Sequence, residues 1–318
     1  MTRILPDAPW RHRSGLSGLL AALDADQGRA RYVGGAVRDG LLGLPVNDLD
    51  IATSLMPQDV VDRLKAAGIK AVPTGIEHGT ITAVLPDGPV EITTLRRDVS
   101  TDGRRATIAY TDDWQQDAAR RDFTFNALYA DPLTGAISDY FGGVADLDAR
   151  HLRFIGDASA RIAEDHLRIL RYFRFLARYG DNEVDASAYD ACVAAANSLM
   201  ALSRERIADE LLKLLVVRDP VPALRLMVDG GIWLPVLPEI THEGIDRLAK
   251  LIARENEASV APSALRRLAA LVPADAALAD QIGARLKLSN KARKRLITAL
   301  ETAPAPEGPR ALAHRVGV

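Results

Sequence analysis

The chain has a single cysteine, Cys192, among its 318 residues. One cysteine excludes an internal disulfide framework and any zinc site built from several cysteines, and it suits a reducing compartment. No stretch approaches about eighteen uninterrupted apolar residues, which excludes an ordinary membrane-spanning helix. The segment from Met1 to Arg13 carries no apolar signal-peptide core. We therefore expect a cytoplasmic protein that does not span a membrane.

A strong charge of either sign is also missing. Forty Lys and Arg stand against 42 Asp and Glu, so the net charge is −2 and any surface for a polyanion must be local. Apolar residues make up 48% and charged residues 26% of the chain, which is ordinary for a globular protein. At this length the sequence has room for two or three folding units with a sizeable core.

The first half of the chain mixes short strands with short helices. Gly79 to Leu85 and Val90 to Arg96 are rich in strand-forming residues, and Pro86-Asp87-Gly88-Pro89 between them predicts a hairpin turn. Pro57 to Ala67 predicts a helix that ends at Gly68. From Ala158 onward the periodicity is helical, and the segments are 162–179, 204–217, 222–228, 245–255, 262–271 and 291–300. The sequence thus predicts an α+β head followed by an all-helical body.

Two glycines open the most informative segment. Gly34 and Gly35 follow a short apolar run, 31–33, that predicts a strand, and the stretch 36–42 predicts a helix directly after them. Backbone N–H groups at a glycine turn that opens a helix are well placed to hold phosphate. Arg38 adds a positive charge one turn into that helix. The segment therefore predicts a phosphate-binding turn.

Carboxylates follow on the next predicted strand. Asp48 and Asp50 are two residues apart, and alternation along a strand directs both to one face. Two parallel carboxylates beside a phosphate cradle are typical of a two-metal phosphoryl-transfer site. Glu91 lies in another predicted strand although Glu is a poor strand former. It is either a third carboxylate near the metals or a residue on a solvated face.

These residues resemble the first signature of the class II nucleotidyltransferases, the family of bacterial tRNA CCA-adding enzymes and poly(A) polymerases. That signature is a Gly-Gly-Ala/Ser-Val-Arg-Asp run, a loop with Leu-Gly-x-Pro, and Asp-x-Asp. Here they are 34–39, Leu42-Gly43-Leu44-Pro45, and 48–50. The run Arg120-Arg121-Asp122-Phe123-Thr124-Phe125-Asn126-Ala127 is similar to the second signature, in which Arg121 would reach the triphosphate or ribose.

The resemblance implies a polymerase-β-like nucleotidyltransferase head with a small mixed sheet at 1–155. A helical neck that recognises the base would follow at 156–218, and an RNA-binding body and tail at 219–318. The implied activity is template-independent addition of C, C and A to the 3′ end of tRNA, using CTP, ATP and two Mg²⁺ ions. A poly(A) polymerase or an A-adding enzyme is the near alternative, and a non-catalytic RNA- or nucleotide-binding module is the distant one. Intact Asp48 and Asp50 argue against the module.

The stretch 164–175 bears on substrate choice. Asp165, Arg168, Arg171 and Arg174 recur every three residues, which predicts a spiral stripe along the helix expected at 162–179. In the resembling enzymes the Glu-Asp-x-x-Arg stretch reads the incoming base. The resemblance thus implies that Asp165 and Arg168 select CTP and ATP, while Arg171 and Arg174 brace this pair or hold phosphate. The alternative is a solvated helix face with an Asp–Arg pair.

Two other polar segments remain open in their interpretation. The segment from Arg97 to Gln116 is polar and contains glycine, and the resemblance implies that it corresponds to a mobile loop that full CCA-adding and A-adding members possess and CC-adding relatives lack. Near the end of the chain, several cations surround a helix start expected at 289–290, and they predict either a contact with the tRNA backbone or a solvated face. These cations are Arg285, Lys287, Lys291, Arg293, Lys294 and Arg295.

Overall fold

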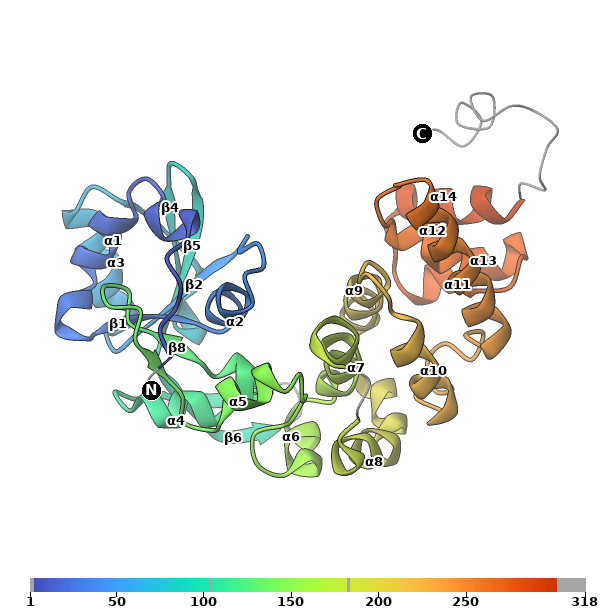
Figure 1. Cartoon of the computed structure of the whole chain (residues 1–318), viewed down its shortest axis with the longest axis horizontal. Helices are drawn as coiled ribbons and strands as arrows, with labels where there is room; N and C mark the ends of the chain where they lie inside the picture. Colours follow the sequence, from blue (N-terminus) through green and yellow to red (C-terminus); the bar gives the residue numbers. More distant parts are fainter. Residues whose placement is uncertain (1–2, 103–104, 182–183, 302–318) are drawn as a thin grey trace. The chain divides into compact units, whose positions relative to one another are not determined.

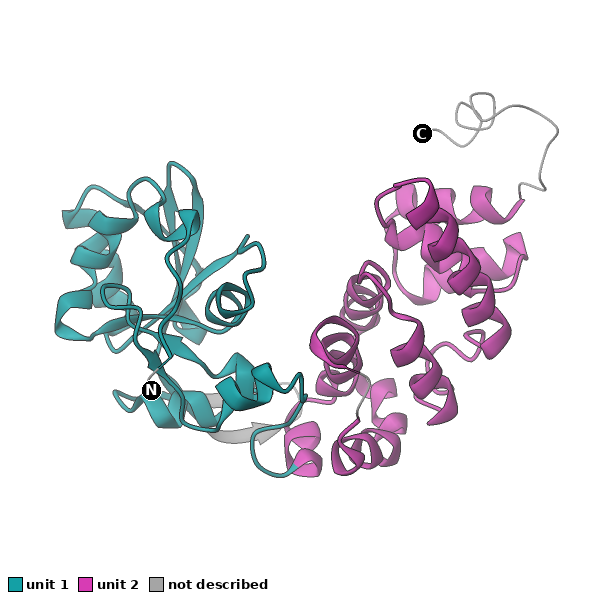
Figure 2. Ribbon diagram, in the orientation of Figure 1, with its two compact units in different colours: residues 1–157 teal, residues 158–318 magenta. Residues whose placement is uncertain are grey.

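The structure is a computed structural model that describes residues 3–102, 105–181 and 184–301. It divides into two compact units, Met1–Asp157 and Ala158–Val318 (Figure 2). The finer division of the helical part into 156–218 and 219–318 stays a prediction.

The first unit is built on a sheet with strand order β3-β4-β5-β2-β1-β8-β9 (Figure 1). Only β2 and β5 pair in parallel among these neighbours, so the predicted mixed sheet is confirmed. The turn at Pro86 and Asp87 joins β4 to β5, as its residue types indicated. The strands are β1 (Ala30–Val33), β2 (Leu49–Thr53), β3 (Lys70–Gly75), β4 (Thr80–Leu85), β5 (Gly88–Thr94), β8 (Tyr129–Ala130) and β9 (Ile137–Ser138).

Short helices cover this sheet and fill its connections. α3 begins at Pro57, where the fixed φ of proline suits the first helical position, and it packs on β3, β4 and α1 through the buried Val60 and Leu64. The α-helices of this unit are α1 (Leu16–Ala22), α2 (Gly35–Leu41), α3 (Pro57–Ala66), α4 (Trp114–Ala119) and α5 (Gly143–Asp148). Single 3₁₀ turns are η1 (Pro9–His12), η2 (Ala25–Gln27), η3 (Ile76–His78) and η4 (Thr124–Asn126).

The segment expected to be a mobile loop contains regular structure. Strands β6 (Arg96–Asp102) and β7 (Arg105–Tyr110) pair antiparallel as a separate two-stranded sheet, and α4 then begins at Trp114. The prediction of a loop was wrong because it weighed polar character above the strand-forming residues Val99, Thr101, Thr107 and Ile108. Gly103 and Arg104, on which the expectation partly depended, lie outside the described residues.

The second unit is helical, as predicted, and its described residues contain no named strand. Within the described residues, no helix is both long enough and apolar enough to cross a membrane. The helices of the second unit are α6 (Ala158–Glu164), α7 (Leu167–Tyr179), α8 (Ala186–Ala194), the 3₁₀ turn η5 (Ala196–Ala201), α9 (Arg204–Leu215), α10 (Val221–Asp229), α11 (His242–Glu257), α12 (Ala264–Leu271), α13 (Ala276–Arg285) and α14 (Asn290–Glu301).

The buried ion pair of Arg267 and Glu255 connects α9, α11 and α12. Arg267 on α12 is 1% exposed and lies 2.8 Å from Glu255 on α11, which is itself buried. The same guanidinium donates to the carbonyl oxygens of Leu215, the last residue of α9, and of Val217 just beyond it, at 2.8 and 2.6 Å. Arg267 therefore satisfies carbonyl groups that the end of α9 leaves without helical partners.

We expect Cys192 to react with thiol reagents only when the helical unit unfolds. The side chain is fully buried in α8, and burial raises the pKa of the thiol, so almost no reactive thiolate forms. Labelling by Ellman's reagent across a urea series, with circular dichroism on the same samples, checks this. Labelling should follow the loss of helix, and rapid stoichiometric labelling of the folded protein would contradict the burial.

Candidate active site

The glycine turn lies between β1 and α2. Gly34 adopts φ 64° and ψ −121°, a conformation that residues with a Cβ rarely take, and its N–H donates to the carbonyl oxygen of Leu128. A Cβ at Gly34 would lie 3.5 Å from Nη1 of Arg121 and 3.6 Å from the carbonyl oxygen of Asn126. The glycine thus lets the second signature approach the first.

The acidic residues gather on neighbouring strands. β2 begins at Leu49, so Asp48 is exposed just before the strand and Asp50 is partly buried within it. Asp50 lies directly opposite Glu91 on the parallel strand β5, which puts the two side chains on the same face of the sheet. Glu91 is exposed, so it is solvated and also adjacent to Asp50.

The pKa of Asp50 reflects both its burial and the charges around it. Burial raises the pKa of Asp50 to about 6; the negative charges of Glu91 and Asp48 add to the rise, and Arg121 opposes it. In the described part of the chain, no side chain donates a hydrogen bond to the Asp50 carboxylate. The site therefore concentrates negative charge that a bound cation would stabilise.

Asp48, Asp50 and Glu91 suit a divalent cation by their chemistry, because hard cations such as Mg²⁺ prefer carboxylate oxygens. Among the described residues, however, no group of three or more acidic, His or Cys side chains has the geometry of a complete metal site. Phosphate oxygens of a nucleotide and water are the usual additional ligands of Mg²⁺. The residues present fit a cation that is bound together with its nucleotide.

Buried hydrogen bonds join the two signatures. Arg38 is 6% exposed and donates from Nε to Asp39 at 2.8 Å and from Nη1 to Oδ1 of Asn126. Asn126 in turn donates to Oδ1 of Asp122 at 2.9 Å. Asp122 also accepts the N–H of Phe123 at 2.9 Å. Arg38 is therefore held inside the site, and its predicted contact with phosphate stays a prediction.

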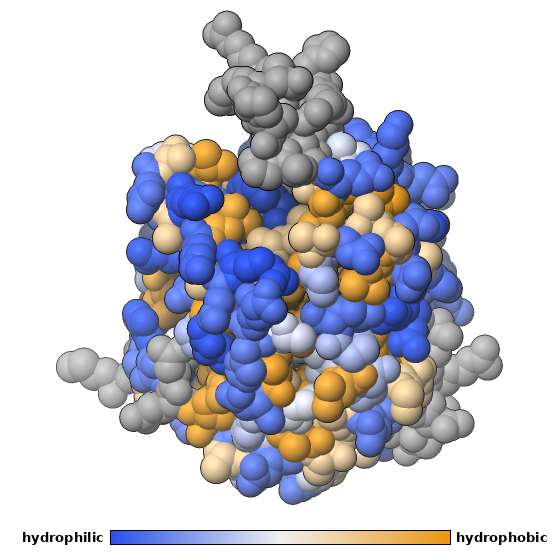
Figure 3. Space-filling model, turned by 90° about the vertical axis from the view of Figure 1, so that its right-hand side faces the viewer, coloured by the Kyte–Doolittle hydropathy of each residue, from blue (hydrophilic) through white to orange (hydrophobic). Residues whose placement is uncertain are grey.

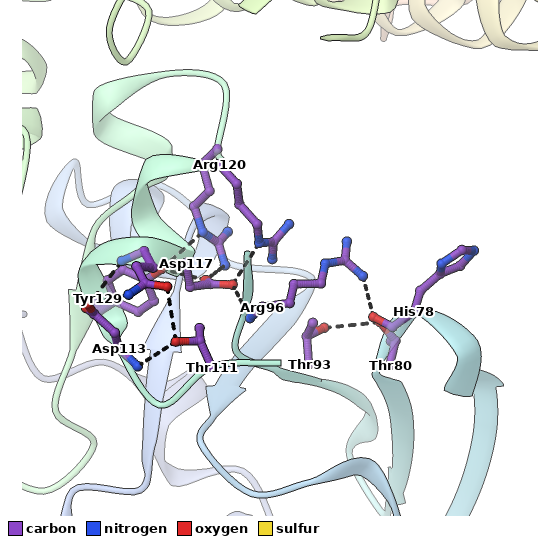
Figure 4. A network of polar contacts seen from close by, with 11 residues as sticks. His78, Thr80, Thr93, Arg96, Thr111, Asp113, Asp117, Arg120 and Tyr129 are labelled. Atoms are coloured by element: carbon purple, nitrogen blue, oxygen red, sulfur yellow. Dashed lines mark hydrogen bonds and ion pairs between the residues drawn. The ribbon is translucent and has the colours of Figure 1, made fainter. Parts of the chain in front are cut away.

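A second network surrounds Arg121. Its Nη2 lies 3.1 Å from Asp117, and its Nε donates to the hydroxyl of Tyr129 at 3.3 Å. Figure 4 shows Asp117 between Arg120, Tyr129 and Arg96; these donors come from the residue just after α4, from β8 and from β6. The guanidinium of Arg121 is thus fixed beside the glycine turn.

Sequence reasoning missed several of these partners. Asn126 stands inside the quoted second signature and could have been weighed as a site residue from its position alone. Asp117 stands three and four residues before Arg120 and Arg121, the spacing of ion pairs on a helical turn, and this was an available signal. Tyr129 and Asp39 carry no such signal.

In the second unit, the predicted helix at 162–179 is broken. α6 ends at Glu164 and α7 begins at Leu167, so Asp165 does not share a helix with Arg168, and the four-residue stripe was wrong in this respect. The Asp165 carboxylate accepts the N–H of Leu167 at 3.1 Å, the kind of local bond by which Asp favours helix starts over helix interiors.

Every member of the predicted stripe has an acidic or basic partner. Asp165 lies 2.7 Å from Arg206 on α9, and Arg168 donates to Glu164 and to the carbonyl oxygen of Arg161. Arg174 lies 2.6 Å and Arg171 lies 3.8 Å from Glu210, which is 4% exposed. These contacts fix the four side chains in place: α9 supplies the partners of Asp165, Arg171 and Arg174, and α6 supplies those of Arg168.

The cations near the end of the chain are partly neutralised. Arg285 pairs with Glu239, Lys287 with Glu205, and Arg293 with Asp280. Lys291, Lys294 and Arg295 are exposed on α14. On the face drawn in Figure 3, hydrophilic residues are interspersed with small hydrophobic patches. The basic segment is thus weaker as an anion-binding surface than its sequence indicated.

Comparison with known proteins agrees with the resemblance to the class II nucleotidyltransferases. The Poly A polymerase head domain matches residues 30–153, and the probable RNA and SrmB-binding site of polymerase A matches residues 183–243. The mitochondrial CCA tRNA nucleotidyltransferase 1 of Danio rerio is 43% identical over 221 residues, which are 69% of this chain and 51% of that protein. A CCA-adding enzyme of Streptococcus pyogenes is 42% identical over 189 residues, 59% of this chain and 46% of that enzyme.

The chain therefore spans about half the length of the curated relatives it matches. The crystal structure of the Bacillus stearothermophilus CCA-adding enzyme in complex with CTP is 31% identical and superposes with a TM-score of 0.76, over 95% of this chain and 74% of that one. With these likenesses and both signatures in place, the chain belongs to the class II nucleotidyltransferase family, which contains the bacterial tRNA CCA-adding enzymes and the poly(A) polymerases.

Proposed function

We propose that this chain adds C, C and A to the 3′ end of tRNA from CTP and ATP without a nucleic-acid template. One observation carries the proposal. The guanidinium of Arg121 lies beside the glycine turn at Gly34 and acts electrostatically on Asp50, whose strand neighbour is Glu91. Relatives whose names state CCA addition support the choice of substrate. The single cysteine is compatible with work in the cytoplasm.

The chain's own residues would act on both reactants. The turn that Gly34 makes would present the backbone N–H of Gly35, and this group together with the charges of Arg38 and Arg121 would hold the triphosphate, so that its α-phosphate faces the tRNA 3′-hydroxyl. Attack by that hydroxyl forms the new phosphodiester bond and releases pyrophosphate. Arg121 would continue to neutralise the pyrophosphate as its charge develops.

Nucleotidyltransferases of this family use a divalent metal ion. We propose two Mg²⁺ ions, with Asp48 and Asp50 as the protein ligands and Glu91 as a nearby third carboxylate. When bound, the metal would supply positive charge that lowers the pKa of the 3′-hydroxyl and stabilises the leaving group.

For choice of the base, we propose Asp165 and Arg168. A carboxylate accepts a hydrogen bond from the amino group of C or A, and a guanidinium donates to the adjacent ring nitrogen. U and G present a carbonyl and a ring N–H at these positions, so each would meet a like partner. The ion pair of Arg206 with Asp165 and that of Glu164 with Arg168 would keep both readers oriented.

Replacing Arg168 by Ala should weaken discrimination against UTP and GTP by about 1–3 kcal/mol, the usual size of one base-specific contact. Asp165→Asn should relax selection further, because an amide can turn its donor toward the carbonyl group of U or G. The measurement is kcat/KM for each nucleotide with tRNA saturating. The control is Arg178→Ala, an exposed arginine on the same helix. Unchanged selectivity in both variants would assign Asp165 and Arg168 a structural role only.

The alternatives differ in product, so separate incubations distinguish them. A tRNA lacking its last three nucleotides is incubated with each labelled nucleotide alone, and a tRNA ending in C-C is incubated with ATP. CTP incorporation on the first and a single A on the second support the proposal. Addition of A only to the C-C end indicates an A-adding enzyme, and long A tracts indicate a poly(A) polymerase. Binding without any incorporation indicates the non-catalytic module.

A further inference from the structure

Asp117 is a fully hydrogen-bonded carboxylate in the interior of the head. Its side chain is 1% exposed, and it receives four donors. Oδ1 accepts Nε of Arg120 at 2.8 Å and the backbone N–H of Arg96 at 3.2 Å. Oδ2 accepts the hydroxyl of Tyr129 at 2.6 Å and Nη2 of Arg121 at 3.1 Å.

The two carboxylate oxygens of Asp117 bind different partners: Oδ1 fixes the carboxylate, and Oδ2 contacts Arg121. Arg120 and the first residue of β6 hold Oδ1, so the carboxylate cannot rotate without breaking bonds to two elements (Figure 4). Oδ2 is thereby fixed toward Arg121. Burial alone would raise the pKa of Asp117, but the charges of Arg121 and Arg120, together with the hydrogen bonds from Tyr129 and Arg120, outweigh it and lower the pKa to about 2, which keeps the carboxylate ionised.

Arg121 uses its remaining atoms at the glycine turn. Nη2 and Nε are engaged by Asp117 and Tyr129, and its guanidinium carbon lies 5.5 Å from the centre of the Tyr129 ring. Nη1 lies on the side of Gly34, 3.5 Å from the position of a Cβ there. Two of the three nitrogens are thus anchored, and the third is directed at the place where the proposed function puts the triphosphate.

We propose that Asp117 is a positioning residue for nucleotide binding: together with Tyr129 it holds Arg121 so that Nη1 meets the β- and γ-phosphates of CTP or ATP. This inference rests on the proposed function for its ligand. A guanidinium with two anchored nitrogens loses little conformational freedom when phosphate binds, so the anchor increases affinity for the triphosphate and not for the base.

The test measures the ratio of CTP affinity to CMP affinity by calorimetry on the full chain. Asp117→Asn keeps the size of the side chain but removes its charge, and Tyr129→Phe keeps the ring. We expect each to weaken CTP binding by about tenfold, the size of one charged hydrogen bond, and to leave CMP binding unchanged. Asp113→Asn is the matched control, because Asp113 caps the same helix without touching Arg121.

A double-mutant cycle separates positioning from general stability. If Asp117 acts through Arg121, then Asp117→Asn adds no further loss of CTP affinity once Arg121 is Ala. Equal weakening of CTP and CMP, or additive losses in the cycle, would overturn the inference, as would an Arg121→Ala variant with an unchanged ratio. Because the readout is binding, a wild-type chain that binds CTP over CMP through Asp117 yet transfers nothing would refute the proposed function and leave this inference standing.

Discussion

The Asp50→Ala variant is expected to lose nucleotide transfer by about a thousandfold or more. Asp50 is the most enclosed of the three carboxylates at the candidate site, with Glu91 opposite on β5 and Asp48 two residues before it. Removing it would take away a proposed metal ligand and the charge that stabilises the developing transition state. Single-turnover incorporation of labelled CMP into tRNA measures the loss.

The fold should survive this change. Burial and its neighbours already disfavour the charged form of Asp50, so the neutral Asp50→Asn should be at least as stable as the parent while it is also inactive. Asp59→Ala, at an exposed position on α3, should keep full activity. An Asp50→Ala rate within tenfold of the parent would remove Asp50 from the site. In the same assay, a large loss in Glu91→Gln would support a third carboxylate, and a small one would assign Glu91 to the solvated face.

Replacing Glu255 by Ala should lower the free energy of unfolding of the helical unit by about 3–5 kcal/mol. Arg267 would then keep its charge at 1% exposure with only the carbonyl oxygens of Leu215 and Val217 as partners. Losing one partner of a buried pair leaves the other charge without compensation. Urea denaturation, followed by the helical signal, gives the change in midpoint.

The matched control is Glu243→Ala on the same helix. Its carboxylate pairs with Arg247 but is 85% exposed, so its loss should cost at most about 1 kcal/mol. The double replacement Glu255→Leu with Arg267→Met should recover part of the stability, because it removes the buried charge altogether. Equal midpoints for the Glu255 and Glu243 variants would show that the buried pair contributes no more than a surface pair.

The parts that sequence could predict depend on neighbours in the chain. Gly34, Gly35 and Arg38 lie within five residues, and β2 follows after one short loop, so their order already defines a turn and a carboxylate strand. The hairpin of β4 and β5 was equally local, since Pro86 and Asp87 lie between two strand-forming runs.

The rest depends on partners far apart in sequence. Asp165 lies in the break between α6 and α7 and pairs with Arg206, which is 41 residues away in the sequence. Arg174 pairs with Glu210, which is 36 residues away. Arg285 is neutralised by Glu239, 46 residues earlier. A single sequence shows each charged residue but not the distant residue of opposite charge that it will pair with. The charges of the stripe and of the basic segment therefore look less neutralised in the sequence than they are in the structure.

The most direct test of the account is the 3′-end sequence of a tRNA transcript that lacks its last three nucleotides, after incubation with the chain, Mg²⁺ and all four nucleoside triphosphates. The account predicts ends that carry C, C and A and extend no further, made by the parent chain and absent with Asp50→Ala. Unextended ends from a chain that nevertheless binds both tRNA and CTP, or ends of mixed sequence, would contradict it.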